Sequence, residues 1–250
     1  SDVAQKIAAA LEAALTPAEK ARIEKKPTAN IEAYKWYLKG REYASRNRKQ
    51  DNETAIDLLK KAITLDSTFA LAWAGLSSAY SARYGFGSAI SWLDSAVAVS
   101  KKAIALDGNS AEAYNALANC YYYRGIYDKA LEGYRKAVDL NPNYFGAVAN
   151  IGNTYMNEGK FDEALPWLKK AVALAPTDPI PAQIGYVHMR LGNFIEAERW
   201  LMKAIELQPD YRNANVFLAN VYVLQNKDRQ ANELMKKLVK KQLKKKKLVH

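Results

Sequence analysis

The chain has 250 residues, and its 37 lysines and arginines outnumber its 26 aspartates and glutamates, giving a formal net charge of +11. Hydrophobic residues make up 49% and charged residues 25%, which is typical of a globular protein and excludes a disordered or collagen-like chain. No stretch approaches the ~18 to 20 uncharged apolar residues of a transmembrane helix. A single cysteine, Cys120, excludes an internal disulfide framework and fits a reducing compartment.

The positive charge is concentrated at the C-terminal end. Residues 236–250 contain eight lysines and no acidic residue, and without them the chain has 29 bases and 26 acids, a net charge of +3. A basic pI predicts nucleic-acid binding when it belongs to a whole domain. Here it belongs to one segment, so nucleic acid is not expected as a partner.

Residues 1–30 are expected to form a separate N-terminal helical segment. Thr16, Pro17 and Glu19 predict the start of its second helix, with an N-cap threonine, a proline at the first position and a glutamate at the third. The chain begins at Ser1 without an initiator methionine or a signal peptide. We therefore interpret it as a fragment or a processed chain and expect it in the cytoplasm.

A repeat of about 34 residues follows this segment. Small and turn-forming residues recur at intervals of 33 or 34 residues, namely Ala130, Ala164, Ala197 and Ala231, and Pro142, Pro176 and Pro209. Each period holds two apolar stripes at helical spacing, separated by a glycine and closed by a proline. The sequence therefore predicts an all-α fold of antiparallel helix pairs.

The turn inside each pair has its own signal. Gly125, Gly159 and Gly192 lie where the first helix must end, a position that favours positive φ. In the last unit Asn226 takes the place of this glycine.

The first two units are longer than the others. Three extra residues lie around 47–52, and seven lie across 83–94. Seven residues make about two helical turns, so both helices of the second unit should be longer, with residues 85–87 at the tip and Ser88 as the next N-cap.

The repeated pattern resembles the tetratricopeptide repeat, in which leucine, a small residue and tyrosine recur in the first helix and alanines in the second. The resemblance covers roughly residues 33–240 and implies an all-α, right-handed superhelical solenoid of about six helix hairpins. It implies a solenoid over 31–235 and a basic capping helix over 236–250. The expected units are 33–69, 70–110, 111–144, 145–177, 178–211 and 212–240.

The N-terminal stretch carries a second resemblance. Residues 4–11, 15–19 and 32–41 are similar to the segment that joins a TolB-like domain to the repeat tail of large bacterial signalling proteins of the adenylate cyclase type. This resemblance implies that a cyclase, a kinase or a DNA-binding domain lies upstream.

One stripe of each first helix is not needed for packing between units, and stacked units turn these stripes into a concave groove, where the resemblance implies peptide binding. Asparagines recur along this stripe. A row of side-chain amides can pair with the backbone of an extended peptide, and tyrosine and methionine add adaptable apolar contacts. The predicted groove residues are Tyr37, Arg41, Asn115, Asn119, Tyr122, Tyr123, Asn150, Asn153, Met156, Asn157, Tyr186, Arg190 and Asn220. The alternative is that the asparagines are ordinary helix surface.

A clamp for a C-terminal carboxylate is not predicted. In the repeat family, domains with such a clamp carry lysine and arginine at three positions. In this chain, those positions hold Asn115, Pro179 and Gln183. Without those cations, a bound carboxylate loses its charge-assisted hydrogen bonds.

An enzyme is not expected either. The chain has only two histidines, His188 and His250. His188 stands where the repeat has its tyrosine, and both His188 and Cys120 are predicted to be packing residues. No phosphate-binding loop, nucleophile elbow or paired-cysteine motif occurs. We therefore predict no catalytic residue, no metal site and no cofactor.

Residues 234–249 are expected to continue the last helix, with an apolar side and many lysines, which favour a helix C-terminus. We interpret this tail as a cap on the open end of the solenoid. Contact with an anionic membrane or with nucleic acid is the alternative.

The function predicted from the sequence is that of a non-enzymatic interaction module. It would bind a peptide or protein segment in its groove, as part of a larger bacterial signalling or scaffolding protein. Self-association as a homodimer is the alternative.

Overall fold

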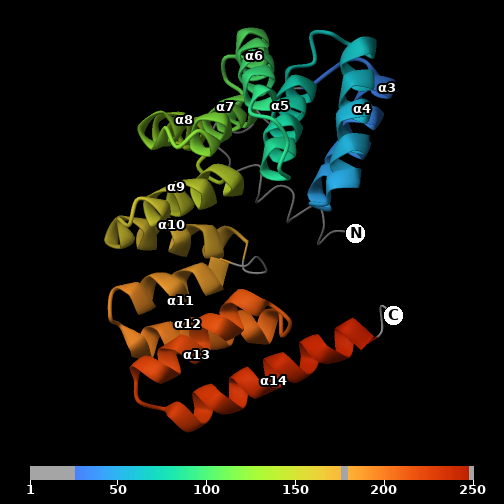
Figure 1. The fold of residues 1–250 in the computed structure, drawn as a ribbon. Coiled ribbons are helices and arrows are strands. Elements are labelled where there is room, and N and C mark those ends of the chain that lie inside the picture. Colours follow the sequence, from blue (N-terminus) through green and yellow to red (C-terminus); the bar gives the residue numbers. More distant parts are fainter. Residues whose placement is uncertain (1–25, 176–179, 248–250) are drawn as a thin grey trace, which may run out of the picture. The chain divides into compact units, whose positions relative to one another are not determined.

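The computed structural model describes residues 26–175 and 180–247. The predictions for the first helices, including the N-cap at Thr16, lie outside the described residues, and so does His250. Within the described part, all regular secondary structure is helical, with twelve helices, α3 to α14, and no strand (Figure 1). This confirms the all-α prediction. None of the described helices is both long and apolar enough to cross a membrane.

The chain divides into two compact units, residues 1–116 and 117–250. Because this division falls inside helix α7, a single continuous solenoid over 31–235 stays a prediction. The two units are described separately.

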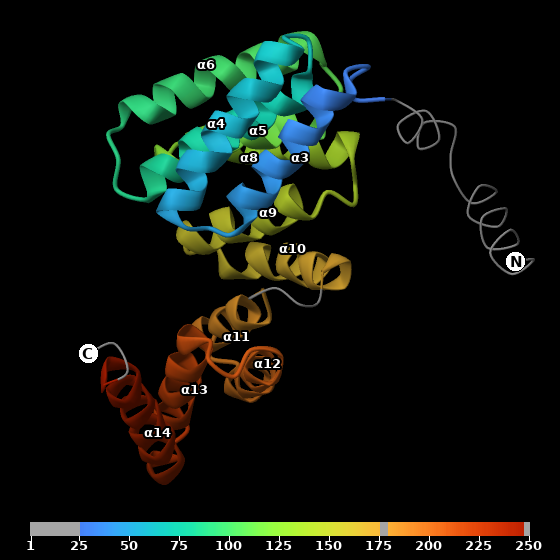
Figure 2. The ribbon, with the colours of Figure 1, turned by 90° about the vertical axis from the view of Figure 1, so that its right-hand side faces the viewer.

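The first unit is built from two helix pairs. Helix α3 packs on α4, α5 packs on α6, and α4 also packs on α5 and so joins the pairs (Figure 2). These helices are α3 (Ile31–Ser45), α4 (Lys49–Leu65), α5 (Ala70–Gly85) and α6 (Ser91–Leu106), followed by the start of α7 (Ala111–Tyr123).

The second unit continues the same pattern. Its helices after α7 are α8 (Tyr127–Leu140), α9 (Phe145–Asn157), α10 (Phe161–Leu174), α11 (Ile180–Arg190), α12 (Phe194–Leu207), α13 (Arg212–Leu224) and α14 (Asp228–Lys247). From α8 onward, each helix packs on the next, and α11 also packs on α13 (Figure 1). The helix hairpins therefore stack along the unit.

Small residues allow the two helices of a pair to approach closely. Ala164 and Ala197 are completely buried in the second helices. In the first helices, a β-carbon at Gly152 would lie 2.7 Å from Cδ2 of Leu168, and one at Gly185 would lie 2.5 Å from Cγ of Leu201. The leucine of the second helix thus occupies the space that the glycine leaves open.

The four turns at Gly125, Gly159, Gly192 and Asn226 each contain the predicted residue in the left-handed conformation. The φ angle is +72°, +75° and +76° at the three glycines and +58° at Asn226. In each turn, the next residue donates its backbone N–H to the carbonyl five residues earlier, at 2.8 to 2.9 Å, which is the hydrogen bond of a Schellman motif. The four bonds join Ile126 to Tyr121, Lys160 to Tyr155, Asn193 to His188 and Lys227 to Tyr222.

Both helices of the second pair are longer than those of the next pair, as the insertion predicts. Helices α5 and α6 have 16 residues each, whereas α7 has 13 and α8 has 14. The predicted N-cap at Ser88 is wrong, because α6 begins at Ser91 with Ile90 as its cap. The first turn is closed by the backbone instead, with the N–H of Leu93 donating to the carbonyl of Ile90 at 2.8 Å.

Candidate protein-binding face

The thirteen predicted groove residues fall into both units. Tyr37, Arg41 and Asn115 belong to the first unit, and the other ten belong to the second. In the second unit they lie on the first helices α7, α9, α11 and α13. We call these ten residues, together with Gln183, Phe161 and Phe217, the first-helix face. Phe161 is the first residue of the second helix α10, and the others lie on first helices.

In the first unit, two of the three predicted residues are buried. Tyr37 is only 4% exposed, because its ring packs edge-on against Phe69, with ring centres 5.0 Å apart. Burial also raises the pKa of the Tyr37 hydroxyl. Asn115 is 7% exposed. The expectation that these two residues offer open surface is therefore wrong, and only Arg41, whose guanidinium lies 5.7 Å from the Tyr37 ring centre, is exposed.

In the second unit, several predicted asparagines bond to other residues of the protein. The Oδ1 atom of Asn119 accepts one hydrogen bond from the Tyr134 hydroxyl at 2.7 Å and another from Nδ2 of Asn150 at 3.0 Å. Nδ2 of Asn157 donates to the Tyr122 hydroxyl at 2.6 Å. These bonds tie α7 to α8 and α9, so part of the asparagine row holds helices together.

Two other amide groups on this face have an unused oxygen. Oδ1 of Asn153 and Oε1 of Gln183 are buried and accept no hydrogen bond from the described residues. An unpaired buried acceptor costs about 1–3 kcal/mol. The unpaired oxygen distinguishes Asn153 from Asn119, and the side chain would have to turn outward for this oxygen to meet an N–H group of a ligand.

An aromatic cluster is centred on Tyr186, which lies on the same helix as Gln183. The ring of Tyr186 lies 4.9 Å from that of Phe217 and 6.2 Å from that of Phe161, measured between centres. Arg190 donates to the Tyr186 hydroxyl at 2.7 Å, and its guanidinium lies 4.7 Å from the Phe161 ring centre. The tyrosine hydroxyl and the rings thus hold the Arg190 side chain in place.

Phe161 and Phe217 were missed by the sequence analysis. A signal for the first was present, because an aromatic residue opens the second helix of three successive pairs, at Tyr127, Phe161 and Phe194. Phe217 lies in the middle of α13 and has no counterpart at the same interval, so only the three-dimensional arrangement reveals its place.

The charge of this face is weakly positive. In the part of the second unit that is described, the first helices contain no aspartate or glutamate, and Arg190 and Arg212 are their arginines. The carboxylates lie on the second helices and in the turns. Arg190 is exposed and makes no ion pair with a described residue, so its charge is available to an acidic ligand.

His188 and Cys120 are buried, as expected for packing residues. Neither ring nitrogen of His188 has a hydrogen-bond partner in the described part of the chain, and burial lowers the pKa of this histidine. Among the described residues, no group of three or more histidine, cysteine, aspartate or glutamate side chains could hold a metal ion.

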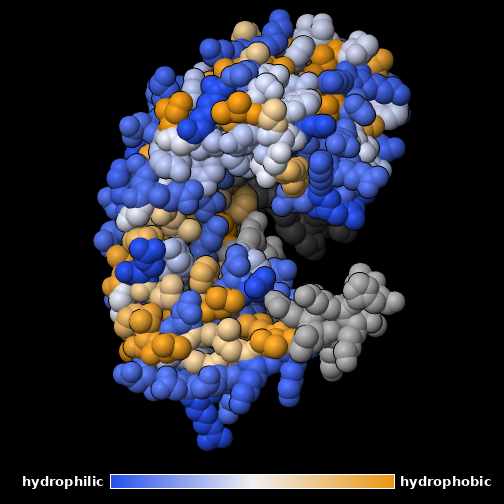
Figure 3. Space-filling model, in the orientation of Figure 1, coloured by the Kyte–Doolittle hydropathy of each residue, from blue (hydrophilic) through white to orange (hydrophobic). Residues whose placement is uncertain are grey.

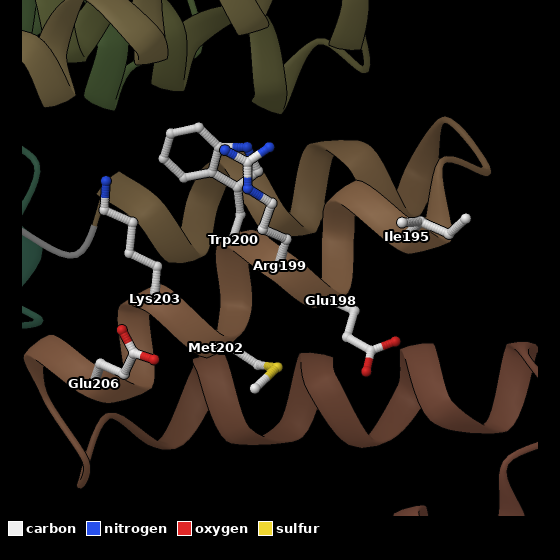
Figure 4. A pocket seen from close by; sticks show the side chains of 7 residues that line it. All are labelled: Ile195, Glu198, Arg199, Trp200, Met202, Lys203 and Glu206. Carbon is white, nitrogen blue, oxygen red and sulfur yellow. The ribbon is translucent and has the colours of Figure 1, made fainter.

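The outer side of the second unit has a hollow of about 530 Å³ along α12. Its lining comes from α12 alone, with Trp200, Arg199 and Lys203 on one side of the helix and Met202 and Glu198 on the other (Figure 4). Binding sites for small molecules are usually enclosed by several elements with converging polar groups. This open surface along one helix does not have that form.

Comparison with known families explains the helix pairs. Residues 111–144 and 147–178 match a family model described as tetratricopeptide repeat, and residues 182–211 match a second model of the same description. These three segments are tetratricopeptide repeats. Proteins with this repeat are interaction modules, and the first-helix face lies largely within the matched residues. No curated protein is a significant match to the chain by sequence.

Solved structures with tetratricopeptide repeats have a similar fold. PilW, a type IV pilus biogenesis factor, superposes with a TM-score of 0.68 and 20% identity over 84% of this chain and 93% of its own. PilF of Pseudomonas aeruginosa gives a TM-score of 0.66 with 17% identity, over 82% of this chain and 90% of its own. A repeat protein of Thermus thermophilus gives 0.62 with 21% identity, over 76% and 99%. At these identities the likeness shows the fold alone, and none of the comparisons supports a TolB-like junction.

Proposed function

We propose that the second unit binds an extended segment of another protein on its first-helix face. The observation that carries the proposal is the pair of buried amide oxygens at Asn153 and Gln183, which accept no hydrogen bond from the described residues and lie close in the repeat pattern to Tyr186 and Arg190. An extended peptide presents backbone N–H groups at regular intervals, and these would pair with the two oxygens once the two side chains turn toward the surface.

The same face suggests which side chains the segment carries. The rings of Phe161, Tyr186 and Phe217 offer apolar contact area. Arg190 offers a charged donor that the tyrosine hydroxyl already orients. We therefore expect a segment with an acidic residue next to an apolar one, because a guanidinium forms strong, charge-assisted hydrogen bonds with a carboxylate.

Peptide selection tests this proposal. Random dodecapeptides displayed on phage would be selected on the full chain, and the best binders would be measured by fluorescence anisotropy. We expect Asn153→Ala combined with Asn220→Ala to weaken binding about tenfold or more, since each lost hydrogen bond contributes about 0.5–1.5 kcal/mol. Asn119 is left intact because it bonds within the fold.

A substitution on the outer side is the matched control. Arg199→Ala changes an exposed residue of α12, and it should leave binding unchanged. Equal binding of the selected peptides to wild type and to the asparagine double variant would refute the proposal.

Self-association is the alternative function. Ile195 is 81% exposed and Met202 is 46% exposed on α12, and contact between two such surfaces would bury apolar area. Light scattering at several concentrations separates the two functions: a mass that stays at one chain excludes self-association, whereas a concentration-dependent dimer favours it.

We also propose that the chain belongs to a larger bacterial signalling or scaffolding protein, on the resemblance of residues 4–41 to a TolB-like junction. Reading the coding sequence upstream of Ser1 tests this. A cyclase, kinase or DNA-binding domain there would support it, and an unrelated upstream sequence would contradict it.

A further inference from the structure

We propose that helix α14 binds the surface of an anionic lipid membrane. This helix runs from Asp228 to Lys247 and has 20 residues, whereas its partner α13 has 13. At 1.5 Å per residue, α14 is about 30 Å long. It extends well past the other helices of the second unit in Figure 1.

The apolar side of α14 is wider than its contact with α13. Leu234 is half-buried against the core cluster of the last hairpins, and Leu238 follows one turn later. One position further around the helix, Met235 is 43% exposed and Val239 is 52% exposed. Leu234 therefore packs on the last hairpins, whereas Met235 and Val239, one turn apart, form an open apolar stripe.

Lysines border the open stripe. Lys236 and Lys240 follow Met235 and Val239 directly, are also one turn apart, and are exposed, as is Lys237. No described carboxylate forms an ion pair with these three lysines. The ion pairs of this region join Arg229 to Glu233 and Lys227 to Glu198 instead. Figure 3 shows the hydrophilic edge along α14 next to a hydrophobic band over α12 and α13.

The charge indicates what covers the open stripe. From Lys236 to Lys247 the helix contains eight lysines and no acidic residue, so a second copy of the same helix would place two strongly positive rows together. An anionic surface is complementary to them instead. An exposed apolar stripe beside a lysine-rich face is the arrangement of helices that lie in the plane of a membrane interface.

The type of cation favours a lipid surface over an acidic protein. Within 236–247 every cation is lysine, and none is arginine. Arginine is preferred for paired, directional contacts with single carboxylates, whereas lysine is a hydrated point charge on a flexible stem. Lysine clusters suit the diffuse negative charge of phosphatidylserine-rich membranes. Met235 and Val239 would then enter the boundary between headgroups and acyl chains.

Vesicle sedimentation with the full chain tests the proposal. The vesicles contain phosphatidylcholine alone or equal parts of phosphatidylcholine and phosphatidylserine. We expect the protein to sediment with the anionic vesicles and not with the neutral ones, and to be released by high salt, since screening weakens exposed charges.

The sequence Met-Lys occurs twice on exposed helix surface and provides a matched pair of variants. Met235→Ser with Lys236→Gln changes the open stripe of α14, and Met202→Ser with Lys203→Gln makes the same change on α12, where Met202 is 46% exposed. We expect the α14 variant to lower partitioning to anionic vesicles about tenfold and the α12 variant to leave it unchanged. Circular dichroism should show the same helix content in both.

The proposal would be overturned by equal partitioning of the α14 variant and wild type, by an equal loss in the α12 variant, or by no binding of wild type to anionic vesicles. Soluble polyglutamate, used as a competitor, tests whether the lysines instead form a binding site for acidic proteins. If polyglutamate removes the chain from anionic vesicles and Met235→Ser alone has no effect on vesicle binding, the lysines recognise any polyanion and the membrane proposal is wrong. Peptide binding to the first-helix face involves other helices, so the two proposals fail separately.

Discussion

Nδ2 of Asn150 on α9 donates a hydrogen bond to Oδ1 of Asn119 on α7, at a distance of 3.0 Å. The same oxygen accepts from the hydroxyl of Tyr134 on α8, at 2.7 Å. One side chain therefore connects three helices of two successive hairpins. A residue that looked like a ligand contact in the repeat pattern is a tie between repeats.

Asn119→Ala should therefore destabilise the fold. The change leaves the almost fully buried Tyr134 hydroxyl without its acceptor, and an unsatisfied buried donor costs about 1–3 kcal/mol. Urea unfolding measures the loss. Asn220→Ala, at an exposed place on α13, should stay within about 0.5 kcal/mol of wild type.

The double variant Asn119→Ala with Tyr134→Phe checks the cause. Removing the hydroxyl as well removes the unsatisfied donor, so the double variant should recover part of the lost free energy of unfolding. Wild-type stability in Asn119→Ala alone would show that this bond does not contribute.

Glycine at the helix–helix crossing gives a second prediction. Gly185→Ala places a β-carbon 2.5 Å from Cγ of Leu201, and such overpacking typically costs about 1–3 kcal/mol. Gly146→Ala is the control, because the nearest atom would be 3.6 Å away in the side chain of Tyr144. Alanine there should be neutral or should stabilise helix α9 by about 0.5–1 kcal/mol. Thermal unfolding distinguishes the two, and a stabilising Gly185→Ala would contradict the packing described for this hairpin.

His188 predicts a pH dependence of stability. Burial lowers the pKa of its imidazole, the charge of Lys169 lowers it further, and Glu196 acts in the opposite direction. The folded state therefore takes up a proton on this histidine only at a lower pH than the unfolded chain, which does so near pH 6.5. The stabilising contribution is complete above that pH and is lost as the pH falls through the lower pKa of the folded state.

His188→Phe removes this titration. Urea unfolding of wild type and variant at about pH 8 and about pH 5 measures it, since those values bracket the histidine range. Wild type should lose more free energy of unfolding than the variant between the two conditions. An equal loss in both would mean that His188 contributes nothing to the acid sensitivity of the fold.

Arg190 predicts a charge preference in the ligand. Arg190→Gln should weaken peptides that contain aspartate or glutamate by about tenfold, because hydrogen bonds to charged groups contribute about 1.5–3 kcal/mol. Peptides without an acidic residue should be affected less. Fluorescence anisotropy at two salt concentrations measures this, and Arg199→Gln on α12 is the control. Equal loss for acidic and neutral peptides would contradict a carboxylate contact at Arg190.

Much of the fold was predictable because its signals are local. Gly125 and Asn226 end their helices through a backbone conformation that the residue type itself favours. The repeat pattern also predicts where the two helices of a pair come close together, because a small residue such as Gly152 recurs there. These features depend on a few neighbouring residues, and the repeat presents them several times.

The candidate site was less predictable because it depends on contacts between distant residues. Periodicity places Tyr37 on the groove stripe of its helix, but it does not show that Phe69, more than thirty residues later, covers its ring. It likewise does not distinguish Asn119, which is bonded within the fold, from Asn153, whose oxygen has no partner in the described part of the chain. Whether a repeated amide is a tie or a contact depends on the neighbouring repeat.

The central claim is that protein segments bind to the first helices of the second unit. Photo-cross-linking tests it most directly, with display-selected peptides that carry benzoylphenylalanine and mass spectrometry to locate the cross-links. The account predicts cross-links on α9, α11 and α13, near Asn153, Tyr186 and Asn220. Cross-links confined to the outer helices α10, α12 and α14 would contradict it.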